Sequence, residues 1–228
     1  MLYVITRTSQ RPNFFKLNCQ SLDQQQGVNL VHVVTCDDKA SRVYINQEMD
    51  KAQTPTHIVE VERQTRTDNG HFPYNLYCNQ AQAYIQALQA STPNGWIMYL
   101  DDDDSFTTPD AAATILKHCV NPNDLIIWKV QFPGHIAPPK RYFGRSVRPS
   151  GFSAIGFAYH SSLINKAQWD DRRGGDGRLI FKLSKVVKEL GGKVVWIDEI
   201  LTAINYDNGY GGLGRRIDCS AASFRHTN

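Results

Sequence analysis

Four consecutive aspartates follow an apolar run near the middle of the chain. The run covers residues 96–100, and the aspartates are Asp101, Asp102, Asp103 and Asp104. Like charges placed side by side repel one another, so this grouping favours folding only if something cationic lies between them. A hard divalent ion, Mg²⁺ or Mn²⁺, takes oxygen ligands and usually shares them with a phosphate. The segment therefore predicts a metal and nucleotide site at the carboxyl edge of an α/β sheet.

Other interpretations of the acidic run explain it less well. A solvated loop is the simplest alternative, but the run directly follows an apolar segment and continues into Ser105 and Phe106. An EF-hand calcium loop fails because Phe106 stands where that loop needs glycine and Ala112 where it needs glutamate. A two-metal hydrolase would need further ligands at short spacing, whereas the seven histidines are scattered.

The composition suits one α/β domain and excludes several other classes of protein. The chain has 228 residues, of which 41% are hydrophobic, enough for a sizeable core. Its 25 basic and 22 acidic residues give a net charge of +3, so nothing draws it generally to nucleic acid or to a membrane surface. No run of 18 apolar residues occurs, and the first six residues are typical of a strand rather than a signal peptide, so we expect no transmembrane segment.

The cysteines indicate a reducing environment. Five are present, widely spaced and never in a C-x-x-C pair, which argues against a disulfide scaffold or a zinc site. We therefore expect a cytoplasmic protein in which the cysteines act as small hydrophobic residues in or near the core.

Strand-like and helix-like segments alternate along the first half of the chain. Apolar, β-branched runs predict strands at residues 2–6, 30–35, 57–61, 96–100, 125–132, 154–159 and 193–197. Helical spacing predicts helices at residues 12–26, 76–90, 109–120 and 178–190, the third with Thr108 as its N-cap and Pro109 in its first turn. This alternation predicts an α/β fold with a mostly parallel central sheet flanked by helices.

With these elements in place, the acidic run resembles the D-x-D motif of GT-A-fold glycosyltransferases, in the form common among their family-2 inverting members. The opening strand and its Thr-Arg turn at residues 3–12 agree with that family, as do the acidic pair Asp37 and Asp38 after the second strand. Asn75 and Asn79 lie on the helix that precedes the D-x-D strand. The resemblance covers residues 2–200 and is strongest to small viral and bacterial sugar transferases.

The resemblance implies one GT-A catalytic domain over residues 1–228. Residues 1–104 would bind the nucleotide, residues 105–205 would form the acceptor and catalytic half, and residues 206–228 would form a flexible tail rich in Gly and Arg. Cys78 stands where the family often has Arg, and Gly175 where it often has Glu. The Q-x-x-R-W motif of processive synthases is absent, so we expect transfer of a single sugar and no polymerisation.

The resemblance also assigns the donor contacts. Asp103 is the main ligand expected for Mn²⁺ or Mg²⁺, and Asp101 shares the metal or binds the ribose. Asp37 or Asp38 would accept from a ring N–H of uracil or guanine, unless they only form a turn. Arg7 and Arg11 could instead be surface residues that add solubility. The nucleotide-sugar contacts expected as a set are Thr6, Arg7, Asp37, Asp38, Asn75, Asn79, Asp101 and Asp102.

An inverting transfer needs a general base to deprotonate the acceptor hydroxyl. The resemblance places Asp176 there, at the start of the 178–190 helix, and its flanking glycines would let an acceptor approach closely. Asp176 could instead be only the N-cap of that helix, with Asp170 and Asp171 as substitute bases. Trp169 and Asp170 are the acceptor contacts we expect, because Trp169 could stack on a sugar.

The chain is therefore predicted to be a metal-dependent, non-processive glycosyltransferase that uses a UDP- or GDP-sugar and a glycan or glycoconjugate acceptor. A sugar-1-phosphate nucleotidyltransferase is the first alternative, although residues 6–12 lack the glycines of its phosphate loop. A non-catalytic sugar-binding relative is the second. The tail could close over the donor with Arg215 and Arg216, and His226 could complete the metal site, but a loose terminus is an equal alternative.

Overall fold

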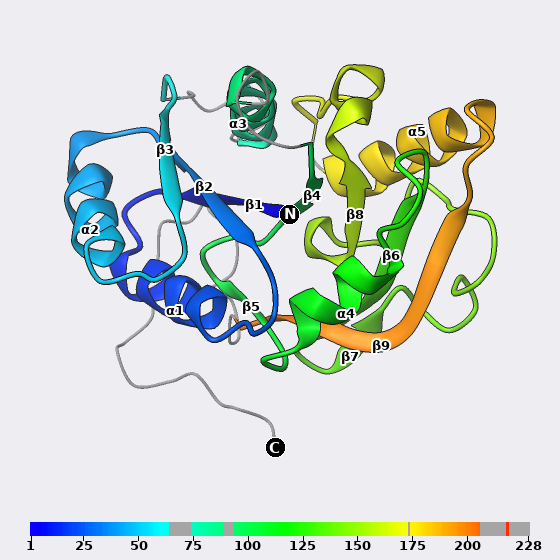
Figure 1. The fold of residues 1–228 in the computed structure, drawn as a ribbon, viewed down its shortest axis with the longest axis horizontal. Helices are drawn as coiled ribbons and strands as arrows, with labels where there is room; N and C mark the ends of the chain where they lie inside the picture. The colour runs from blue at the N-terminus through cyan, green and yellow to red at the C-terminus, as the bar shows by residue number, and fades with distance from the viewer. Residues whose placement is uncertain (64–73, 89–93, 173, 206–217, 219–228) are drawn as a thin grey trace.

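The first half of the molecule is a parallel sheet. The computed structural model describes residues 1–63, 74–88, 94–172, 174–205 and 218. Strand β1 (Leu2–Thr8) lies between β2 (Leu30–Cys36) and β4 (Trp96–Tyr99), parallel to both, and β2 continues the sheet to β3 (Thr56–Glu60) (Figure 1). The carboxyl ends of these strands therefore meet along one edge.

The second half adds antiparallel strands and curls the sheet. Strand β8 (Phe157–His160) runs antiparallel to β4 and to β6 (Leu125–Phe132), and β6 pairs parallel with the long β9 (Val194–Ile204). The short strands β5 (Asp104–Phe106) and β7 (His135–Ala137) pair antiparallel with β9 and β6. The predicted α/β class, with a mostly parallel sheet flanked by helices, is confirmed.

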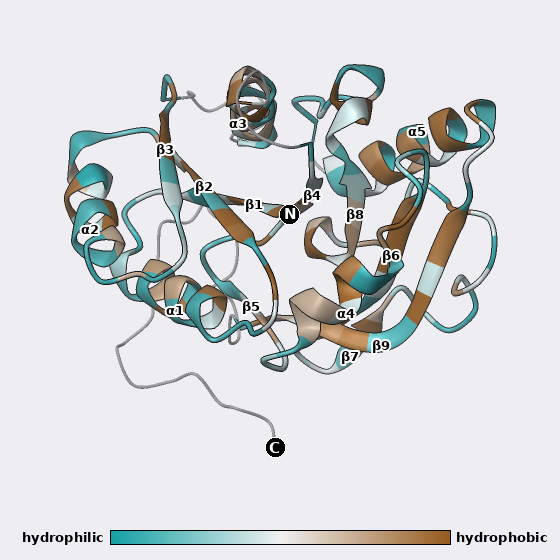
Figure 2. Ribbon diagram, viewed as in Figure 1, coloured by the Kyte–Doolittle hydropathy of each residue, from teal (hydrophilic) through white to brown (hydrophobic). Residues whose placement is uncertain are grey.

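Helices cover both faces of the sheet. Those described are α1 (Pro12–Asp23), α2 (Lys39–Met49), α3 (Asn75–Leu88), α4 (Ala111–His118) and α5 (Gly175–Glu189), with 3₁₀ turns η1 (Ala154–Gly156) and η2 (Ser161–Lys166). Tyr3 and Ile5 of β1 pack with α3 and α5, whereas Leu2 and Val4 pack with α1 and α4. This alternation is what a strand buried on both faces requires. Figure 2 shows the apolar residues along β6, β9 and α5 and the hydrophilic ones on α2.

Helix α5 begins earlier than its apolar spacing predicts. Leu179, Ile180, Leu183 and Val187 are buried as expected. The helix nevertheless starts at Gly175, because Gly174 takes the left-handed conformation, φ 72°, at the N-cap. Asp176 is thereby placed inside the first turn of the helix.

Several other predicted elements need correction. Helix α2 was not predicted, because only Ser41, Tyr44 and Ile45 of it are buried. Strands β5 and β7 were also missed, and β9 extends well past residue 197. Residues 154–156 form η1, so only the end of the predicted 154–159 strand is extended. Helix α4 has Asp110 at its N-cap in place of Thr108, whose hydroxyl donates to the Asp110 carboxylate instead.

The structure also bears on the expectations about the cysteines and about a transmembrane segment. Cys19, Cys36 and Cys78 are buried free thiols, and Cys119 is half-buried. Among the helices of the described ranges, none combines the length and the apolar character needed to cross a membrane.

Candidate functional site

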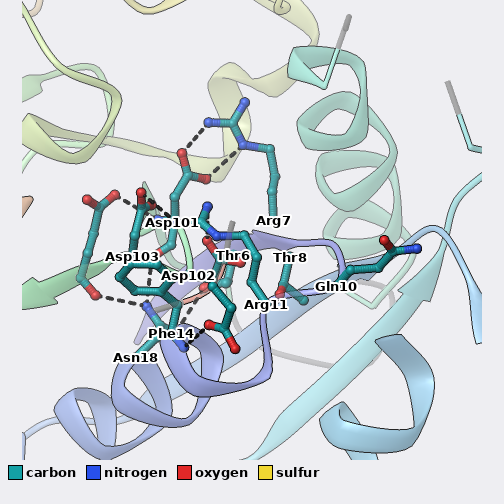
Figure 3. A network of polar contacts seen from close by, with 12 residues as sticks. Thr6, Arg7, Thr8, Gln10, Arg11, Phe14, Asn18, Asp101, Asp102 and Asp103 are labelled. Carbon is teal, nitrogen blue, oxygen red and sulfur yellow. Dashed lines mark hydrogen bonds and ion pairs between the residues drawn. The ribbon is translucent and has the colours of Figure 1, made fainter. Parts of the chain in front are cut away.

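The carboxyl ends of β1 and β4 bring an arginine against the acidic run. Arg7 Nε donates to Asp101 Oδ1 at 2.8 Å, and Arg7 Nη2 forms an ion pair with Asp101 Oδ2 (Figure 3). Arg7 Nη1 also donates to Oδ1 of Asn75, the first residue of α3, at 2.9 Å. Arg7, Asp101 and Asn75 thus form one polar cluster at the edge of the sheet.

A second arginine lies between the next two aspartates. Arg11 Nη1 is 2.8 Å from Asp102 Oδ1 and its Nη2 is 2.9 Å from Asp103 Oδ2, and its side chain is 0% exposed. Its guanidinium lies over the Phe14 ring, 4.4 Å from the centroid. The alternative that Arg11 is a surface residue is therefore wrong. The cation that the aspartates require is supplied by arginine, so their grouping does not by itself demand a metal.

The four aspartates differ in burial and in the partners that hold them. Burial raises the pKa of Asp102 to about 8 against the opposing charge of Arg11, and burial raises that of Asp104 well above its ordinary value. Asn18 of α1 fixes the turn by donating to the carbonyls of Asp101 and Asp104 at 3.0 and 3.2 Å. The side chains of Asp101 and Asp103 remain 20% and 7% exposed. Asp102 and Asp104 therefore belong to the scaffold, Asp103 is nearly as buried as Asp104, and Asp101 is the most exposed of the four.

Asp101 and Asp103 carry the kind of ligand atom that a divalent ion prefers. Mg²⁺ and Mn²⁺ prefer oxygen ligands, and Mg²⁺ is held by one or two carboxylates plus substrate phosphates. Arg7 already contacts both oxygens of Asp101 and Arg11 one oxygen of Asp103, so an ion here would have to compete with these arginines. In the described ranges no group of three or more His, Cys, Asp or Glu side chains is arranged to hold a metal, so an ion here would depend on the donor for its remaining ligands.

The two acidic residues after β2 have different roles. Asp38 is the N-cap of α2: its carboxylate accepts from the Ser41 amide at 2.6 Å and from Gln10 Nε2 at 3.1 Å. Asp37 accepts from the Tyr77 hydroxyl of α3 at 3.0 Å. Burial raises the pKa of Asp37, and hydrogen bonds from Ser9 and Tyr77 oppose that rise. Asp37 is the better placed of the two for a nucleotide base.

Thr6 lies within the core and away from the open edge. Its buried hydroxyl donates to the Leu100 carbonyl at 2.7 Å and lies 2.9 Å from His32 Nε2. It therefore joins the strand ends beneath the site, and a direct contact with a nucleotide would require it to leave these partners.

The asparagines of α3 bind the loop that carries Trp169. Asn79 donates to the Trp169 carbonyl at 2.9 Å and accepts from its amide at 3.0 Å, and Asn75 Nδ2 donates to the Arg172 carbonyl at 3.3 Å. Trp169 is 4% exposed, and its ring meets the Tyr99 ring edge-on. The guanidinium carbon of Arg7 lies 5.8 Å from the centroid of the Trp169 ring. Trp169 thus forms a wall behind Arg7 and has no open face on which a sugar could stack.

Asp170 is held by a neighbouring arginine. Arg178 Nε and Nη2 donate to its two carboxylate oxygens at 2.8 and 2.6 Å, which lowers the pKa of Asp170 to about 2. The expected acceptor contact therefore already has a strong bidentate partner. An acid with so low a pKa is also a weak base, so Asp170 is a poor substitute for Asp176.

Asp176 follows Gly175, where an added Cβ would lie 2.4 Å from Nδ2 of Asn75, the residue that accepts from Arg7. Burial raises the pKa of the Asp176 carboxyl group above the ordinary value, and the charge of Asp101 adds to the rise. The amides of Asp176 and Ala154 and the charge of Arg7 oppose it. The N-cap of α5 is Gly174, so the alternative that Asp176 is only the N-cap is wrong.

The glycines beside Asp176 face protein. A Cβ at Gly175 would lie 2.4 Å from Asn75 Nδ2, and one at Gly177 would lie 2.3 Å from the Pro149 carbonyl oxygen. Their missing side chains allow α3 and the 149–150 loop to approach the helix, and do not clear space for an acceptor as the sequence suggested. The expectation about these glycines is therefore wrong, although their position next to Asp176 keeps the site compact.

A residue near the end of the chain returns to this edge. Asp218 accepts from the amides of Asn13 and Phe14 at 2.9 and 3.0 Å, at the beginning of α1. Pro12 has no amide hydrogen, so these are the first donors that the helix offers. No pattern in the sequence predicts this contact. Arg215, Arg216 and His226 lie outside the described residues.

The sheet order, the helices on both faces and the acidic edge agree with a GT-A-like fold, and the solved structures that match the chain share this fold. The fold implied by the sequence resemblance is therefore confirmed, while the subfamily stays open. No protein-family model matches the chain, and a search of curated proteins finds no match.

Several solved structures are similar to this chain. The chain is similar to S. aureus TarS 1–349, with a TM-score of 0.62 and 16% identity over 89% of this chain and 59% of that one. The same protein in complex with UDP-GlcNAc gives 0.61 and 15%, over 91% and 59%. The mannosyltransferase PcManGT from Pyrobaculum calidifontis, in complex with GDP-Man and Mn²⁺, gives 0.61 and 14%, over 92% and 58%. The chain spans less than two thirds of each of these neighbours.

Proposed function

We propose that this chain transfers one sugar from a nucleoside-diphosphate sugar to a hydroxyl group of a glycan or another acceptor, with inversion. The observation that carries the proposal is the convergence of Arg7, Asp101 and Asp176 at the carboxyl edge of a GT-A-like sheet. Ligands of open α/β sheets bind at this edge. The bound donors of the structural neighbours, UDP-GlcNAc and GDP-Man, support the same class of substrate.

The donor would lie across the ends of β1, β2 and β4. Asp37 would accept from the base, with Tyr77 holding its carboxylate in place. Asp101 and Asp103 would hold Mn²⁺ or Mg²⁺, which when bound neutralises the charge that develops on the departing diphosphate. Arg7, paired with Asp101, adds a fixed positive charge at the same point. The bound Mn²⁺ in PcManGT is consistent with this use of a divalent ion.

Asp176 would act as the general base. Its carboxylate takes the proton of the acceptor hydroxyl while that oxygen forms a bond to the anomeric carbon. The bond from that carbon to the phosphate oxygen breaks at the same time, and the nucleoside diphosphate leaves. Burial raises the pKa of Asp176, and a base whose pKa approaches the working pH accepts the proton more effectively.

Two carboxylate variants test the proposal. Asp176→Asn should lower kcat by about 10²- to 10⁴-fold, as loss of a general base does, while UDP or GDP with Mn²⁺ binds as in the wild type. Asp50→Asn changes an exposed carboxylate at the end of α2 and should leave the rate unchanged. Isothermal titration and release of nucleoside diphosphate from a panel of UDP- and GDP-sugars provide the two measurements. Normal turnover by Asp176→Asn would show that Asp176 is not the general base.

The same assay separates the alternatives. A sugar-1-phosphate nucleotidyltransferase would release pyrophosphate from a nucleoside triphosphate, and a non-catalytic relative would bind nucleotide without turnover. The turn after β1 does not favour the nucleotidyltransferase, because residues 6–12 contain no glycine and Arg11 is paired with Asp102 and Asp103. We also keep the cytoplasm as the expected location, on the basis of the cysteines.

A further inference from the structure

The loop between β7 and η1 is basic and contains no acidic residue. Within residues 138–153 stand Lys140, Arg141, Arg145 and Arg148, without any Asp or Glu. These are four of the chain's 25 basic residues, which leaves 21 basic against 22 acidic in the rest. The positive excess of the whole chain therefore resides in one loop of its second half.

The three arginines of this loop surround a hollow of about 440 Å³. It is lined by Arg141, Tyr142, Arg145, Ser146 and Arg148. The guanidinium groups of Arg141 and Arg148 lie 4.9 and 5.5 Å from the centroid of the Tyr142 ring. The ring itself packs on Gly151, whose φ is 83° and where an added Cβ would lie 3.0 Å from Tyr142 Cε2. The arginines are thus held on a fixed aromatic support.

These arginines are available to a ligand. Within the ranges the structure describes, none of the three forms an ion pair, in contrast to Arg7 and Arg11. A guanidinium group presents a planar fork that matches a phosphate or carboxylate, and stacking on an aromatic ring reduces the entropy lost on binding.

The loop that lines the hollow contacts the helical turn that carries the residue proposed as the base. Pro149, next to Arg148, contacts Gly177, next to Asp176: a Cβ on that glycine would lie 2.3 Å from the Pro149 carbonyl oxygen and 3.1 Å from the Ser150 amide nitrogen. The backbone that carries Arg148 and the helical turn that carries Asp176 are therefore in direct contact.

We propose that this hollow binds the acceptor, and that the acceptor is an anionic sugar whose phosphate or carboxylate group lies close to the hydroxyl that is glycosylated. The inference rests on the proposed function, because Asp176 would take the proton of that hydroxyl. The arginines position the acceptor through its charge, whereas the donor diphosphate is bound at the ends of β1 and β4.

The experiment uses the full chain with its donor site filled. UDP or GDP with Mg²⁺ is added to saturation, and binding of glucose 6-phosphate, glucuronate and glucose is measured by saturation-transfer NMR. The wild type should bind the two anionic sugars at least tenfold more tightly than glucose. The double variant Arg141→Gln with Arg148→Gln should lose that preference and still bind nucleotide, whereas the exposed control pair Lys166→Gln with Lys188→Gln should keep it.

The possible results are distinct. Equal binding of the anionic sugars by the wild type and the Arg141 and Arg148 variant would overturn the inference, as would their displacement by the nucleotide. The ratio of glucose 6-phosphate to glucuronate affinity shows whether phosphate or carboxylate is preferred. If the double variant fails to fold, Arg145→Gln alone should still weaken anion binding severalfold. Failure of the wild type to bind any nucleotide would refute the proposed function while leaving the anion result to stand.

Discussion

The arginines of this chain lie in two contrasting environments. Arg7 and Arg11 are largely or fully buried at the ends of β1 and β4, and carboxylates of the acidic run bind both. The three arginines of the 138–153 loop surround an open hollow and stand on or near Tyr142. The first region is closed by its own charges, whereas the second presents charge that nothing in the described chain neutralises.

The difference shows how pairing decides what a residue can do. A buried arginine between two carboxylates stabilises a turn, and its removal leaves charges without compensation. An exposed arginine that lacks a carboxylate partner contributes little to folding and keeps its hydrogen-bond donors for a ligand. The donor edge therefore has a rigid framework, and the acceptor side has a charged surface.

The largest expected effect follows from removing the buried arginine. Arg11→Met should lower the free energy of unfolding by about 3–5 kcal/mol at neutral pH, because the carboxyl groups of Asp102 and Asp103 would lose the buried cation that lies between them. Chemical denaturation measures the change. Arg42→Met is the matched control, because its pair with Glu60 at 3.3 Å is exposed and should contribute at most about 1 kcal/mol. An equal loss of unfolding free energy in Arg11→Met and Arg42→Met would contradict the contrast between buried, paired arginines and exposed ones.

The sequence predicted the strands better than the charges that hold them together. Apolar runs such as residues 96–100 identify buried strands, because hydrophobic composition is local. The position of the acidic run at the end of β4 followed from the same pattern. The pairing of Arg11 with Asp102 did not, because it depends on β1 lying next to β4 in the sheet, which no local pattern encodes.

The remaining surprises have the same origin. Asn18 is one of many polar residues in the α1 sequence, and only its place beneath the aspartate turn makes it a partner of Asp101 and Asp104. Asp218 caps a helix 205 positions away in the sequence. Helix α2 escaped prediction for a local reason, because few of its residues are buried.

The next effect concerns the pH dependence of the proposed reaction. Asp176 must be ionised to act as a base, so kcat/KM should rise with pH through its pKa. The charge of Arg7 lowers that pKa and the charge of Asp101 raises it. Arg7→Gln should therefore move the acidic limb of the pH profile to higher pH, and Asp101→Asn should move it to lower pH.

Arg148→Gln provides the comparison with the second region. It should reduce kcat/KM for an anionic acceptor without moving the limb, because its charge is not among the main influences on Asp176. Shifts of Arg7→Gln and Asp101→Asn in the same direction would mean that the limb belongs to another group.

A smaller effect is expected at the beginning of α1, directly after Arg11. Asp218→Ala removes the carboxylate that accepts from the amides of Asn13 and Phe14, and loss of such a cap costs about 1 kcal/mol. Asp50→Ala is a suitable control, because Asp50 is an exposed residue at the C-terminal end of α2, where a negative charge does not favour the helix. Hydrogen exchange of the Phe14 amide should rise only in the first variant, and no change there would place the cap elsewhere.

The smallest effect should come from the basic loop. Arg145→Gln should change the free energy of unfolding by less than about 0.5 kcal/mol, as exposed substitutions usually do. Because Lys140, Arg141 and Arg148 lie on the same loop, the sign at low ionic strength should be stabilising, since one of four like charges is removed. Added salt should abolish the gain, because exposed charges are screened within about 10 Å at 0.1 M. A loss of more than about 1 kcal/mol that persists in salt would mean that this arginine has a structural partner, and the two regions would then differ less than their ion pairs indicate.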